Sequence, residues 1–172
     1  MIKQALLTMA GIQSLVSLGE IAQRQRGFRQ ARDYADSLGK PLLVVGTPKG
    51  GWLFHPCGDV TIDIAPCMQR YCNTQIADIR AIPYDDQYFG AAFVSHVLEH
   101  LPTLADAHIA LAELHRVAEK VFVVCPHKIS LTAWLHPDHH LWVTPDGDGF
   151  IIEQRNKPVT RASCLATITA NP

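Results

Sequence analysis

Four short runs of mainly apolar residues set the strongest limit on how this chain can fold. They are Leu42–Val45, Val60–Ile64, Ala91–Ser95 and Val121–Cys125. The first is wholly apolar and closed by Gly46, as is typical of a strand buried on both faces of a parallel sheet. Between the last two runs, residues 103–120 begin with the N-cap residue Thr103 and carry leucines at helical spacing. Strands alternating with helical connections predict an α/β fold with a mostly parallel central sheet and helices on both faces.

The C-terminal part predicts a different kind of pairing. Residues 150–154 and 164–169 are typical of two strands, and the turn residues Asn156-Lys157-Pro158 lie between them. We expect an antiparallel pair that closes the central sheet. With 172 residues, 48% of them hydrophobic, the chain suffices for one domain with a real core, which we place at residues 39–172.

Residues 1–38 form a separate segment that is apolar at first and basic later. On a helix, one face would carry apolar side chains from Ile2, Leu6, Met9, Ile12 and Val16. Four arginines follow, namely Arg24, Arg26, Arg29 and Arg32. Such a helix suits packing on its own domain, docking on a membrane surface or protein partner through residues 1–32, or a cleaved signal. The apolar run is too short to span a bilayer, and we expect residues 1–22 to be dispensable for the fold.

Charge and cysteine content bear on partners and compartment. The net charge is −1, which gives no footprint for nucleic acid. The five cysteines, an odd number, contain no C-x-x-C pair, so we expect reduced thiols and a cytoplasmic protein, with peripheral membrane association through the N-terminal segment as a further possibility.

The stretch Asp78–Leu101, DIRAIPYDDQYFGAAFVSHVLEHL, is the most informative for function. Its order of an acid, a Pro-and-acid turn, an apolar run and a Leu-Glu-His-Leu helix start resembles class I S-adenosylmethionine-dependent methyltransferases, in particular the small methyltransferase type 11-like domains. The resemblance covers roughly residues 40–155. It implies a Rossmann-like methyltransferase fold with a C-terminal antiparallel pair, and S-adenosylmethionine as cofactor.

The resemblance also implies a cofactor site at the carboxyl ends of the strands. The glycine-rich loop after the first strand provides Gly46, Thr47, Pro48 and Gly50, and it departs from the family pattern because Pro48 replaces the middle glycine and Val44 replaces an acid. Asp63, followed by Ile64, ends the second strand, where a carboxylate can accept hydrogen bonds from both ribose hydroxyls. By the same resemblance, Asp78 and Ile79 recognise the adenine edge, and Ser95 and His96 line the floor below the reacting methyl group.

Methyl transfer asks mainly for orientation, with a general base where the acceptor loses a proton. We place His96, Glu99 and His127 in catalytic roles, with His96 as the base. Eight of nine histidines lie between positions 96 and 140, which raises a zinc or iron site as an alternative. The adjacent His139 and His140 would point to opposite faces of a strand, and the chain lacks an H-E-x-x-H motif, so we predict no metal site.

The sequence therefore predicts a methyltransferase acting on an unidentified small-molecule or protein acceptor. The alternative is a methyltransferase-like scaffold or accessory subunit that has lost catalysis and is held in a membrane-associated or larger assembly by residues 1–32.

Overall fold

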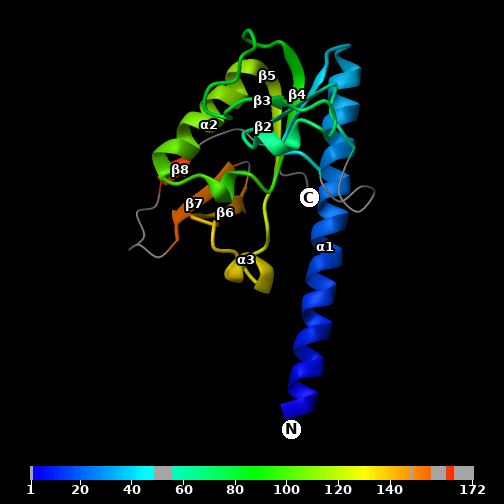
Figure 1. The fold of residues 1–172 in the computed structure, drawn as a ribbon, viewed down its shortest axis with the longest axis vertical. Coiled ribbons are helices and arrows are strands. Elements are labelled where there is room, and N and C mark those ends of the chain that lie inside the picture. The colour runs from blue at the N-terminus through cyan, green and yellow to red at the C-terminus, as the bar shows by residue number, and fades with distance from the viewer. Residues whose placement is uncertain (1, 49–55, 148, 156–161, 165–172) are drawn as a thin grey trace.

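A five-stranded parallel sheet forms the centre of the protein (Figure 1). The structure, a computed structural model, describes residues 2–48, 56–147, 149–155 and 162–164. The strands are β1 (Leu42–Val45), β2 (Val60–Asp63), β3 (Gln75–Ile76), β4 (Phe89–Ser95) and β5 (Ala118–Val124). Their order across the sheet is β3-β2-β1-β4-β5. The chain therefore adds β2 and β3 on one side of β1, and then crosses over to add β4 and β5 on the other side. The predicted α/β class and parallel sheet are confirmed.

Helices cover both faces because the buried strands alternate their side chains. On β1, Leu43 and Val45 join the core that includes α2 (Leu104–Val117), whereas Leu42 and Val44 face α1 (Ile2–Ser37). Thr103 caps α2 as predicted, its side chain accepting the backbone N–H of Asp106 at 3.1 Å. The predicted layering is confirmed.

Only the C-terminal part of α1 packs on the sheet. Phe28, Ala31 and Ala35 are buried there, and Gly27 allows the close approach, because an added Cβ would lie 3.0 Å from a Val124 methyl carbon. The first half projects away from the sheet (Figure 1), with Leu15 71% exposed. Among the described helices, none has the length and apolarity needed to cross a membrane.

The C-terminal strands pair as predicted but do not join the central sheet. β7 (Gly149–Gln154) pairs antiparallel with β8 (Ala162–Cys164) and, on its other side, with β6 (Leu141–Asp146), a strand that the sequence analysis missed. The expectation that the pair closes the central sheet was wrong: β6 occupies the neighbouring edge of β7, and the apolar faces of these two strands pack on the α2-side core. The predicted turn at 156–158 lies outside the described residues.

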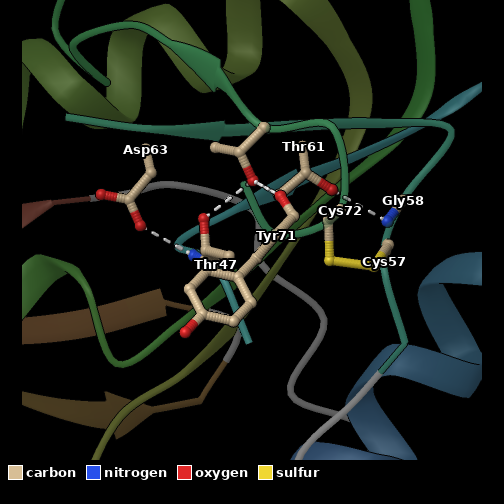
Figure 2. Close-up of a disulfide and its surroundings, with 8 residues drawn as sticks. Thr47, Cys57, Gly58, Thr61, Asp63, Tyr71 and Cys72 are labelled. Atoms are coloured by element: carbon tan, nitrogen blue, oxygen red, sulfur yellow. Dashed lines mark hydrogen bonds between the residues drawn. A yellow bond between two sulfur atoms is a disulfide. The ribbon is translucent and has the colours of Figure 1, made fainter. Parts of the chain in front are cut away.

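The expectation of reduced thiols was wrong for two cysteines. Cys57 and Cys72 form a disulfide with Cα atoms 5.6 Å apart (Figure 2), while Cys67 and Cys125 are free. The bridge joins the segment before β2 to the loop before β3, which the parallel pairing of these strands brings together. The inference of a cytoplasmic location rested on reduced thiols and loses that support.

Candidate active site

A cavity of about 710 Å³ opens at the carboxyl ends of β1, β2 and β4. This is the edge where an open α/β sheet binds ligands, at the point where strand order reverses. Every described residue predicted to contact cofactor lines it: Gly46, Thr47, Pro48, Asp63, Ile64, Asp78, Ile79, Ser95 and His96. Gly50 lies outside the described residues.

The loop after β1 is shaped by a glycine and fixed by a carboxylate. Gly46 has φ 88°, and a Cβ there would lie 2.7 Å from the Val97 Cγ2 atom, so only glycine fits. The Thr47 N–H donates to Asp63 Oδ2 at 2.9 Å, as Figure 2 shows, and the Thr47 hydroxyl lies 3.0 Å from the Thr74 hydroxyl. Asp63 therefore joins the ends of β1 and β2.

Asp63 organises the loop from the position where the sequence predicts a ribose contact. Its second oxygen, Oδ1, accepts the Ala65 N–H at 2.9 Å, and each oxygen keeps a further lone pair for a ligand. Val44, which stands where the family usually has an acid, is fully buried in the core beneath α1. An acid at this position would therefore point into that core and not toward the loop. The Asp63 carboxylate is thus the acidic group that holds the loop after β1.

Asp78 is held by a side chain that the sequence analysis did not single out. Arg80 contacts both Asp78 oxygens, with Nη2 2.6 Å from Oδ2, and its other nitrogen, Nη1, lies 2.6 Å from Asp106 Oδ1. The hydrogen bonds from Arg80 hold the pKa of the Asp78 carboxyl below its usual range. Arg80 also lines the cavity, so a charged pair borders the proposed adenine side.

The floor of the cavity is built around His96. This residue has a left-handed backbone, φ 56°, and its N–H donates to the Val124 carbonyl at 2.8 Å, which holds it at the end of β4. Its Nδ1 atom lies 3.5 Å from Oε1 of Glu99 in the short helix η3 (Leu98–His100). Glu99 is buried beneath it, and burial raises the pKa of this carboxyl to about 8. Glu99 does not line the cavity itself, whereas His96 does.

Comparison with known proteins supports the family suggested by the sequence. Residues 57–121 match the family model described as a methyltransferase domain, Methyltransf_11. This part of the chain is similar to that domain. The match spans the Asp63 strand and the Asp78–Leu101 stretch. No curated protein matches the chain.

Several solved structures have related shapes. PH0226 from Pyrococcus horikoshii OT3 is 18% identical over 79% of this chain and 75% of its own, with a TM-score of 0.43. The complex of the Haloferax volcanii Trm112 methyltransferase activator and a putative methyltransferase is 16% identical over 64% of this chain and 58% of its own, with a TM-score of 0.40. NodS, an N-methyltransferase from Bradyrhizobium japonicum WM9 bound to S-adenosylhomocysteine, is 16% identical over 53% of this chain and 55% of its own, with a TM-score of 0.38. This chain spans less than two thirds of the length of the last two structures.

One residue that lines the cavity comes from α1, outside the matched region. Arg24 of α1 lines the pocket, one helical turn before Phe28, which packs on the sheet. Burial lowers the pKa of the Arg24 guanidinium, and the charges of Glu20 and Glu99 partly offset this. Arg24 lies four positions before the buried Phe28 on α1, and this spacing is the sequence signal from which its approach to the domain could have been predicted.

His127 is not brought to the cavity with the other predicted residues. It is exposed, its N–H donates to Glu20 Oε1 at 3.1 Å, and its Nδ1 accepts the Ile129 N–H at 3.2 Å. These contacts tie the segment before α3 (Leu131–Leu135) to α1. A catalytic role for His127 stays a prediction without support from the geometry of the domain.

Proposed function

We propose that this protein is an S-adenosylmethionine-dependent methyltransferase that binds its cofactor in the cavity at the ends of β1, β2 and β4. One observation carries the proposal: the Thr47–Asp63 hydrogen bond places a glycine-shaped loop and a carboxylate at the same edge of the sheet. This is the arrangement that a nucleoside bearing an amino-acid tail needs.

The residues present fit such a cofactor. Gly46 has no room for a Cβ, so at this position the loop presents only backbone to the space that the methionine part of the cofactor would occupy. Asp63 has acceptor capacity for ribose hydroxyls, and the walls formed by Ile64 and Ile79 offer apolar surface to a purine. Asp78, whose pKa is lowered by Arg80, would accept a hydrogen bond from an exocyclic amino group.

When bound, S-adenosylmethionine supplies a methyl group on a positively charged sulfur, and the group that departs is neutral. The chain's own contribution is to hold both reactants in line and to keep His96 where it can take a proton from the acceptor atom. Glu99 Oε1, which lies 3.5 Å from His96 Nδ1, is the group placed to orient the imidazole.

Calorimetric titration with S-adenosylhomocysteine tests the cofactor part of the proposal. We expect one site per chain with a Kd on the order of 10–100 μM, equivalent to roughly 5.5–7 kcal/mol, because Pro48 removes one backbone donor from the loop. A folded protein that gives no heat at millimolar ligand would reject the proposal and favour the scaffold alternative.

His96→Gln separates binding from catalysis. This variant should lose about 10²- to 10⁴-fold in turnover of an acceptor that must lose a proton, a loss much larger than any accompanying change in S-adenosylhomocysteine affinity. Turnover equal to that of the wild type with such an acceptor would remove His96 as the base.

A further inference from the structure

Three imidazole rings meet at the edge of the cavity. His100 ends η3, whereas His136 and His139 follow α3, so the fold brings together two segments that are distant in sequence. Nitrogen atoms of the three rings, one from each, all lie within 4.8 Å of one another. His100 and His136 also line the cavity. Imidazole nitrogens in this number are a ligand set for a transition metal.

Backbone carbonyls orient two of these rings for coordination. The His100 Nδ1 atom lies 3.1 Å from the Asp138 carbonyl oxygen, and the His139 Nδ1 atom lies 3.1 Å from the Ala133 carbonyl oxygen. Because a carbonyl oxygen only accepts, both rings carry their proton on Nδ1 and leave Nε2 unprotonated. Metal-ligating histidines commonly donate their other ring N–H to a carbonyl oxygen in this way.

The segment that carries two of the histidines is fixed by further contacts. The Arg155 guanidinium donates to the carbonyl oxygens of Ala133, His136 and His139 at 3.1–3.3 Å. The His140 N–H donates to the Glu99 carbonyl at 2.8 Å and so ties this segment to η3. The three rings are therefore held on a braced backbone.

We propose that His100, His136 and His139 bind a divalent transition metal ion, with Zn²⁺ as the expected ion, at the rim of the cavity. Three histidines leave at least one coordination position for water or for an oxygen or nitrogen donor of a ligand. If the proposed function holds, that position is available to an acceptor hydroxyl; metal binding itself does not depend on methyl transfer.

The rings must close around the ion, and His136 must turn out of its stacked contact with His139, in which the ring centroids lie 4.4 Å apart. Bonds of about 2.0–2.1 Å in a tetrahedral site place nitrogens about 3.3 Å apart, so the widest separation of 4.8 Å must shrink. His100 and His136 are exposed and have room to rotate. His136 must also change partner, because its Nδ1 accepts the Asp138 N–H at 3.3 Å. It coordinates either through Nδ1, in place of this long hydrogen bond, or through Nε2 after moving its proton to Nδ1.

The test is titration of the purified full chain with Zn²⁺ by calorimetry and with Co²⁺ by visible absorption. We expect one ion per chain and the intense visible bands of a four-coordinate cobalt site. His100→Asn and His139→Asn keep a side-chain donor for the carbonyl oxygens while removing the ligand. Each should weaken binding at least about 100-fold, which is the upper range for losing only a group that hydrogen-bonds to a ligating histidine.

His108→Asn, in α2 and outside the cluster, is the matched control and should bind as the wild type does. Thermal unfolding of every variant shows that it is folded, and S-adenosylhomocysteine titration of the same samples separates this proposal from the proposed function. Absence of stoichiometric binding in the wild type would overturn the metal site. Equal affinity in the folded His100→Asn, His139→Asn and His108→Asn variants would overturn it as well.

Discussion

Removal of the Asp63 carboxylate is the sharpest test of the cofactor site. In Asp63→Ala, the Thr47 and Ala65 N–H groups lose acceptors at 2.9 Å, and a bound ribose loses its hydrogen-bond partner. A hydrogen bond to a charged group contributes about 1.5–3 kcal/mol, so S-adenosylhomocysteine affinity should fall about 10- to 150-fold. The loop after β1 also loses its anchor, which should lower the thermal midpoint.

A second aspartate controls for the loss of stability. Asp59 likewise accepts a backbone N–H, that of Leu42 at 2.7 Å, and an Arg32 nitrogen at 2.6 Å, but it does not line the cavity. Asp59→Ala should lower the thermal midpoint and leave the affinity unchanged. Calorimetry and thermal unfolding of both variants decide the matter. Tight binding by the wild type with unchanged affinity in Asp63→Ala would refute the assigned role.

Three further outcomes follow from the fold. Cys57→Ser should destabilise the protein by about 3 kcal/mol in chemical denaturation, because its bridge closes a loop with a sequence separation of 15; an equal effect of the exposed Cys67→Ser would contradict this. Pro48→Gly should tighten S-adenosylhomocysteine binding by up to about tenfold, since it restores a backbone donor worth roughly 0.5–1.5 kcal/mol, and weaker binding would show that the rigid loop matters more. Deletion of residues 1–12 should leave the thermal midpoint nearly unchanged, because the described side chains there are exposed; loss of cooperative unfolding would place them in the core.

Deleting residues 1–22, as the sequence suggested, removes more than exposed surface. Gln13 exchanges hydrogen bonds with the backbone of Ile129 and Leu131, and Glu20 accepts the His127 N–H. The shorter deletion keeps these contacts, so comparing the two truncations by thermal unfolding measures what they contribute. Equal midpoints would show that they contribute nothing.

The sequence by itself determined four of the five strands of the central sheet, all but β3, and half of the residues that line the cavity. Apolar runs such as Leu42–Val45 are local signals, since a strand buried on both faces needs an apolar side chain at every position. Functional residues in this fold directly follow strands, so Gly46, Asp63 and Ser95 could be placed once the strands were known. A parallel sheet then brings the ends of its strands to one edge.

Only the tertiary structure decided which distant segments meet. The Cys57–Cys72 bridge, the reach of Arg24 into the cavity and the grouping of His100 with His136 each join parts of the chain whose spacing carries no periodic signal. The separate sheet of β6, β7 and β8 has the same origin, because alternating apolar residues specify a buried face but not the neighbour that covers it. Contacts of this kind depend on how the elements pack, and packing is a property of the whole fold.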